Sequence, residues 1–134
     1  MATPSLVDRK LNASRQFTDD LLQRGSPIVA AYWEFVEERD RWIFYVVPKL
    51  AADELKVIEQ TVKLLADAPY ETYISIFDVF VDSRQLSRAK ALSSCIRGPR
   101  DLGREIGTFA DGHYFESAIV VYMAPELLQQ YSAV

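Results

Sequence analysis

Apolar side chains recur with a helical period in three parts of the chain. The first part predicts a helix over roughly residues 5–24, with Ser5 as a possible cap and Gly25 as its stop. Its stripe has one polar interruption, Ser14, among these apolar positions: Val7, Leu11, Phe17 and Leu21. The interruption weakens the pattern without ending it.

Two further helices follow from the same spacing. One runs over roughly residues 53–67 behind an Asp53 cap, and its expected buried stripe is Leu55, Ile58, Val62 and Leu65. The other begins at Asp82-Ser83 and continues to about Ile96, with these residues facing inward: Leu86, Ala89, Leu92 or Ser93, and Ile96.

Between the helices, the pattern changes to runs rich in β-branched and aromatic residues, typical of strands. Ile28 to Glu37 and Arg41 to Val47 are separated by a short polar turn and predict an antiparallel hairpin. The period of two places four aromatic side chains on one face of it: Trp33, Phe35, Trp42 and Phe44. A third strand is expected from Thr72 to Val81.

The last two strands, Glu105 to Ala110 and His113 to Met123, flank Asp111-Gly112. An Asp-Gly pair between strand-like runs predicts a type I′ turn, because both of its central positions need a positive φ. Pro125 then begins a short terminal helix or tail.

The resulting order is α-ββ-α-β-α-ββ, which predicts a single α+β domain over residues 1–134. Residues 1–4 and 125–134 are its expected tails, the latter alternatively a short helix. We expect one mixed, mainly antiparallel, five-stranded sheet with helices packed on it. A helical crossover joins the second and third strands, and is right-handed if they are parallel.

Acidic and basic residues are unevenly distributed along the sequence. The chain has a formal net charge of −4, yet the segment from Arg84 to Arg104 carries +5. Such a segment marks where an anionic partner could bind. The residues expected to contact an anion or a partner protein are Lys90, Arg97, Arg100 and Arg104. General nucleic-acid binding is disfavoured, because a pI near 5.0 is at odds with a broad basic face.

Gly98 and Gly103 are spaced like the glycines of a phosphate-binding loop, but here they follow a helix and precede a strand, which is the wrong context. A structural alternative is that the arginines pair with acids of the same molecule. The acids considered for that pairing are Asp78, Asp82 and Glu105.

Acidic residues inside strand-like runs offer a catalytic alternative: Glu34, Glu37, Asp78 and Glu116. If they met, they could bind Mg²⁺ or act as acid–base groups, with His113 as a general base. A small hydrolase would then use Asp78, His113 and Glu116. The simpler interpretation places the acids on the water-facing side of an antiparallel sheet.

Cys95 is the one cysteine and His113 the one histidine, so neither a disulfide within the chain nor a cysteine-based zinc site is expected. We expect Cys95 to be a buried small residue, and no cofactor. The first residues do not resemble a signal peptide, and the apolar runs fall short of the roughly 20 residues of a membrane-spanning helix. A cytoplasmic protein without membrane contact is the default.

The sequence alone does not establish a function. The favoured interpretation is a non-catalytic binding module of an adaptor, regulatory or immunity-like kind, whose partner is another protein or a second copy forming a homodimer. It would use the basic segment 84–104 or an aromatic hairpin surface, while the acidic majority could meet a basic partner. The alternatives are a binder of a phosphorylated small molecule or RNA through Arg97, Arg100 and Arg104, and the small hydrolase.

Overall fold

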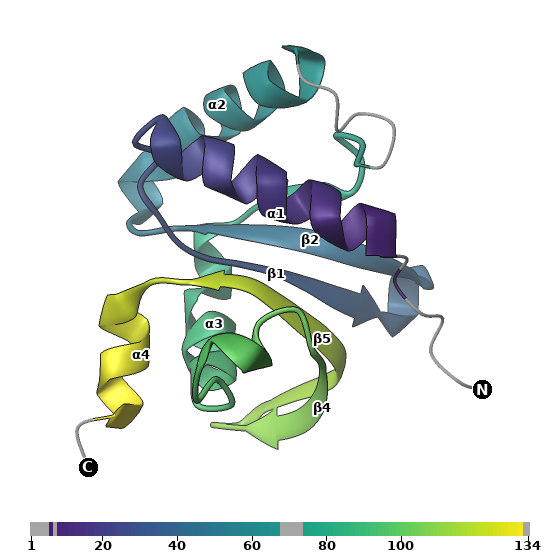
Figure 1. Ribbon diagram of the computed structural model, residues 1–134, viewed down its shortest axis with the longest axis vertical. Coiled ribbons are helices and arrows are strands. Elements are labelled where there is room, and N and C mark those ends of the chain that lie inside the picture. The colour runs from purple at the N-terminus through teal and green to yellow at the C-terminus, as the bar shows by residue number, and fades with distance from the viewer. Residues whose placement is uncertain (1–5, 7, 68–73, 133–134) are drawn as a thin grey trace.

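The structure is a computed structural model that describes residues 6, 8–67 and 74–132. One mixed sheet in the strand order β3-β2-β1-β5-β4 lies between two layers of helices (Figure 1). The elements in chain order are α1 (Asp8–Gln23), β1 (Ile28–Val36), β2 (Arg41–Pro48), α2 (Glu54–Asp67), β3 (Val79–Val81), α3 (Leu86–Ser93), β4 (Glu105–Ala110), β5 (His113–Met123) and α4 (Pro125–Ser132). The predicted α+β class and five-stranded sheet are confirmed.

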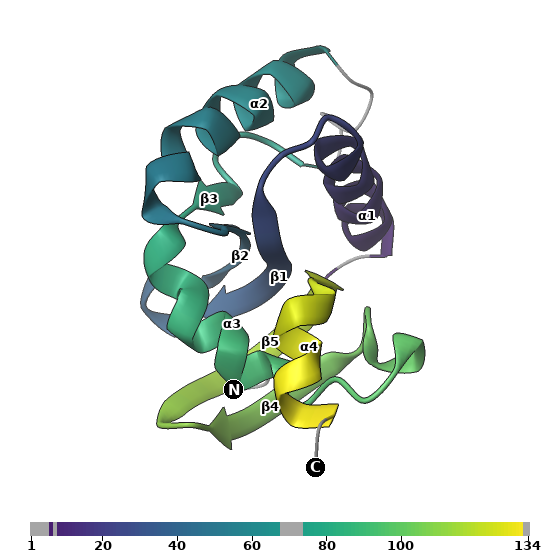
Figure 2. The ribbon, with the colours of Figure 1, turned by 90° about the vertical axis from the view of Figure 1, so that its left-hand side faces the viewer.

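The two hairpins meet at the centre of the sheet, where β1 pairs with both β2 and β5 in antiparallel fashion. β3 lies at one edge, parallel to β2, because α2 carries the chain back over the sheet between them. α1 and α2 cover one face, whereas α3 and α4 cover the other (Figure 2). The sheet therefore separates two cores, one on each of its faces.

The expected aromatic layer is confirmed and forms the middle of the core beneath α1. Trp33 lies opposite Phe44, and Phe35 lies opposite Trp42, in the β1–β2 register. Ser14, which interrupts the stripe of α1, is fully buried here and accepts a hydrogen bond of 2.9 Å from the indole N–H of Trp33. The polar position in the helix thus satisfies a polar atom of the core.

The expected buried stripe of α2 is wrong at three of its four positions. Leu55, Ile58 and Val62 are 67%, 37% and 48% exposed. The helix instead buries a neighbouring set: Val57, Thr61, Leu64 and Leu65. Apolar residues lie on both stripes, so periodicity alone cannot decide which one faces the sheet.

The expected third strand is also too long. Thr72 and Tyr73 fall outside the described residues, and β3 covers only Val79–Val81. Before it, the Asp78 carboxylate accepts a hydrogen bond from the Ser75 backbone N–H at 3.1 Å. This contact between an aspartate and a nearby backbone group closes a turn and ends the strand pattern.

The other element predictions are close to the structure. Asp111 and Gly112 have φ values of 47° and 81°, as the predicted type I′ turn requires. Asp82 caps a 3-10 turn over Ser83–Gln85, and α3 ends at Ser93, earlier than expected. Within the part of the chain that the structure describes, none of the helices is both long and apolar enough to cross a membrane.

Candidate functional site: an acidic hollow beside Arg88

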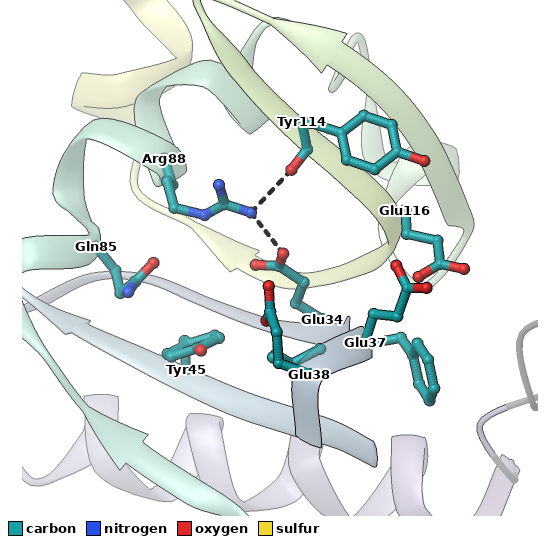
Figure 3. A pocket seen from close by; sticks show the side chains of 10 residues that line it. Glu34, Glu37, Glu38, Tyr45, Gln85, Arg88, Tyr114 and Glu116 are labelled. Carbon is teal, nitrogen blue, oxygen red and sulfur yellow. Dashed lines mark hydrogen bonds and ion pairs between the residues drawn. The ribbon is translucent and has the colours of Figure 1, made fainter. Parts of the chain in front are cut away.

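A hollow of about 280 Å³ opens on the face of the sheet that carries α3 (Figure 3). Its walls come from four parts of the chain: the end of β1 with the turn after it, β2, the start of α3 with the residue before it, and the start of β5. Its lining includes Glu34, Glu37, Glu38, Tyr45, Gln85, Arg88, Tyr114 and Glu116. The hollow thus brings Arg88 of the basic segment next to the last hairpin.

Arg88 is fixed at the inner side of the hollow by three contacts. Its Nη2 atom donates to the Glu34 carboxylate at 2.5 Å and to the carbonyl oxygen of Tyr114 at 3.1 Å. The guanidinium carbon also lies 4.2 Å from the ring centre of Phe115, a cation–π geometry. Arg88 therefore links α3 to β1 and to the start of β5.

An irregularity in the last hairpin shapes the wall formed by Tyr114 and Glu116. The β4–β5 register shifts between Ile106 and Thr108, which leaves Gly107 beside a bulge in β5. A Cβ atom at Gly107 would lie 3.0 Å from the carbonyl oxygen of Glu116. Glycine at this position permits the close approach of the two strands and so allows Glu116 to line the hollow.

Burial shifts the pKa values of two residues at the inner side of the hollow, Glu34 and Tyr45. It raises the pKa of the Glu34 carboxyl, and the charge and hydrogen bond of Arg88 act in the opposite direction. Burial also raises the pKa of the Tyr45 hydroxyl, as does the negative charge of Glu34. Tyr45 is therefore neutral at physiological pH and presents an uncharged ring and hydroxyl to the hollow.

Negative charge exceeds positive charge around this space. Four carboxylates line it, from Glu34, Glu37, Glu38 and Glu116, and Arg88 is the one basic residue among the lining side chains. Arg88 already pairs with Glu34. Figure 3 shows Glu37, Glu38 and Glu116 around that pair. The site can therefore attract a cation by charge and offer tyrosine rings for contact.

Arg97, Arg100, Arg104 and Lys90 are exposed and lie outside this lining. The carboxylate of Asp101 accepts a hydrogen bond from the backbone N–H of Arg97 at 2.7 Å and lies 3.8 Å from the Arg104 guanidinium. Asp101 thus offsets part of the positive charge of this turn. The pairing acid is Asp101, not one of the acids the sequence analysis considered.

The three residues proposed for hydrolysis are not brought together. Asp78 pairs with Lys10 of α1 at 3.5 Å. His113 contacts the Ser87 hydroxyl of α3 at 2.8 Å, on the side of the sheet opposite α1. Glu116 alone lines the hollow. A serine–histidine contact is used in nucleophilic catalysis, but here the serine is exposed and neither residue lines the hollow.

Two further expectations need correction. Glu34 was expected on the water-facing side of the sheet, yet it is buried beneath α3, because Arg88 neutralises it there. Cys95 is only half-buried, since it follows the end of α3. Among the described residues, no group of three or more His, Cys, Asp or Glu side chains is placed to hold a metal ion.

Arg88, Tyr45, Gln85 and Glu38 line the site but were not expected there from the sequence. One signal for the inner pair was available: Glu34 is an acid inside an apolar strand and required a basic partner. That partner lies 54 residues away in the chain, so the fold was needed to identify it. Comparisons of the chain with protein-family models, with curated proteins and with solved structures found no match.

Proposed function

We propose that the protein is a non-catalytic binding module whose acidic hollow receives a cationic group of its partner, a guanidinium or an ammonium. The observation that carries this proposal is the charge of the hollow: four carboxylates surround one arginine that is already paired. A cationic group entering beside Glu37 and Glu116 would gain attraction from both and contact the Tyr114 ring.

The exposure of Tyr114 supports a macromolecular partner. Tyr114 is 63% exposed at the rim, and its cross-strand neighbour Phe109 is 70% exposed. Aromatic side chains on a surface are enriched at protein interfaces. The module would thus hold a basic side chain in the hollow while the hairpin contacts the chain that carries it.

Isothermal titration calorimetry with agmatine and spermidine, at low and at physiological salt, tests the proposal. Both cations should bind, and their affinity should fall as salt rises, since salt screens exposed charges. The double variant Glu37→Gln/Glu116→Gln should lose at least about fivefold in affinity, because one exposed and one half-buried charge contact are removed.

The matched control is Asp19→Asn/Glu59→Gln, which removes two exposed carboxylates from α1 and α2, on the opposite face. It changes the net charge equally and should retain the affinity of the unmodified protein. Equal losses in the two double variants would mean that the cations respond to overall charge, and the proposal would then be wrong. Binding of inorganic phosphate in place of the cations would also overturn it.

A further inference from the structure

α2 carries a second apolar stripe that the described part of the chain leaves exposed. Leu55, Ile58 and Val62 lie on it, beside the stripe that packs into the core. A helix with apolar residues on more than one side is usually covered on more than one side. This exposed stripe is an apolar surface that none of the described residues covers, and it is suited to a contact with a second molecule.

The stripe borders a groove between α2 and the edge of the sheet, which is mainly apolar apart from Glu54, Asp82 and Arg84. Two hollows of about 330 and 390 Å³ adjoin there, and both are lined by Val62 and Ile76. Thr61 lines the first hollow as well. Its hydroxyl is buried, and no hydrogen-bond partner for it is present among the described residues. The groove wall thus combines apolar contact area with an unsatisfied polar atom.

β3 borders the same groove with an open backbone edge. Towards β2, the carbonyl of Asp78 accepts from the Phe44 N–H at 2.8 Å, and the N–H of Asp82 donates to the Val46 carbonyl at 3.1 Å. Backbone groups alternate in direction along a strand, so those of Val79 and Val81 point away from β2. β3 is the edge strand and pairs with β2 on one side, so within the described ranges no strand pairs with these outward groups.

We infer that the protein forms a homodimer in which β3 of one copy pairs with β3 of a second copy in antiparallel fashion about a two-fold axis at Phe80. Val79 then exchanges two backbone hydrogen bonds with Val81 of the second copy, and the symmetric exchange forms on the other side of the axis. The edge is self-complementary, because each copy supplies the same donors and acceptors at positions 79 and 81.

The same axis also covers the exposed stripe. A two-fold axis perpendicular to the sheet keeps both copies of α2 on one face, adjacent to the shared edge, as Figure 2 lets the reader follow from α2 and β3. Ile58 and Val62 can then pack against the same residues of the second copy. Three-residue strands alone are too short for a stable pairing, so this apolar contact would supply most of the affinity.

The β3–β3 dimer should respond to salt differently from a dimer held together by opposite charges. Arg39 and Arg41 lie 5.1 and 6.0 Å from the ring centre of Phe80, so dimerisation brings like charges from two copies towards the axis. Salt should therefore preserve or strengthen the dimer, since it screens repulsion and does not weaken apolar burial. Pairing between the basic segment and the acidic hollow of another copy would weaken in salt.

Disulfide trapping tests the axis directly. In a Cys95→Ser background, Phe80→Cys should form a crosslinked dimer under mild oxidation, because residues facing each other in a non-hydrogen-bonded pair have Cα atoms about 4.5 Å apart, within disulfide range. The control is Phe109→Cys, at a more exposed aromatic position on the last hairpin. It should crosslink at least about tenfold more slowly, although its thiol is more accessible.

Sedimentation equilibrium provides the second measurement. The unmodified protein should show a monomer–dimer equilibrium that is not weakened by salt, and Ile58→Asp/Val62→Lys should weaken it at least about tenfold while the circular dichroism spectrum is unchanged. Glu37→Gln/Glu116→Gln should dimerise normally, so this inference and the proposed function can fail separately. A monomer at all concentrations, or equal crosslinking at positions 80 and 109, would overturn the inference.

Discussion

At the scale of single residues, the pair formed by Arg88 and Glu34 determines the inner side of the hollow. The arginine holds a carboxylate in a buried position and connects the helix to two strands. Burial raises the pKa of Glu34, so its ionised form is less favourable in the folded protein than in the unfolded chain. The stability contributed by this group is therefore greatest at low pH and falls as pH rises through the raised pKa.

Removing Arg88 should make the stability of the protein depend more steeply on pH. Arg88→Met leaves Glu34 without its counter-charge, and we expect the free energy of unfolding to fall by about 2–4 kcal/mol at pH 7. Below about pH 4 the loss should be smaller, because Glu34 is then protonated in both states. Urea unfolding at the two pH values measures the difference. Glu34→Gln/Arg88→Met should recover part of the loss, and an equal loss at both pH values would contradict this account.

Ser14 illustrates the same dependence on a single polar contact. Ser14→Ala leaves the Trp33 indole N–H unsatisfied in the core, and the expected cost is about 1–3 kcal/mol. The matched control is Ser94→Ala, whose hydroxyl donates to Ala91 within its own helix end and should change stability by less than about 0.5 kcal/mol. Thermal unfolding of both variants provides the comparison. Similar midpoints for the two variants would show that the indole contact is not needed.

At the scale of elements, local signals predicted most of the fold. The Asp-Gly pair correctly predicted the β4–β5 hairpin. The alternation of aromatic residues correctly predicted which face of the β1–β2 hairpin lies in the core. The predictions were wrong where the same sequence pattern fits two different structures. α2 has apolar residues on two stripes, and the turn at Ser75–Asp78 resembles a strand in composition. Tertiary packing decides both cases, and a single sequence does not contain that information.

The bulge beside Gly107 gives a prediction at this scale. Gly107→Ala places a Cβ atom 3.0 Å from a backbone oxygen of β5, so we expect a loss of about 1–2 kcal/mol in stability and weaker binding of agmatine. Gly98→Ala meets open space in an extended conformation and should be neutral or stabilising by up to about 1 kcal/mol. Chemical unfolding and calorimetry of the two alanine variants test the contrast. Identical behaviour would mean that the bulge does not shape the hollow.

At the scale of the whole molecule, the two proposed contacts use different parts of the sheet. The acidic hollow lies on the face of α3, whereas the apolar groove lies along α2 and the β3 edge. The sequence showed that basic residues gather in one segment. It did not show where the acidic hollow would form. The hollow depends on residues from β1, β2, α3 and β5, which only the fold brings together.

Because the two surfaces are separate, disrupting one should leave the other intact. Ile58→Asp/Val62→Lys should bind agmatine with the affinity of the unmodified protein, within about twofold, since additivity holds for distant sites. Calorimetry on this variant under dimerising and dilute conditions measures it. A large loss of cation affinity in the variant would show that the hollow is complete only in the dimer.

Binding of a cationic group in the hollow beside Arg88 can be mapped residue by residue with NMR. Agmatine would be titrated into ¹⁵N-labelled protein while backbone amide shifts are followed. We expect saturable shift changes concentrated at residues 34–38, at Arg88 and at residues 114–116, and we expect these changes to be lost in Glu37→Gln/Glu116→Gln. Changes spread over all acidic surfaces, or centred elsewhere in the chain, would contradict it.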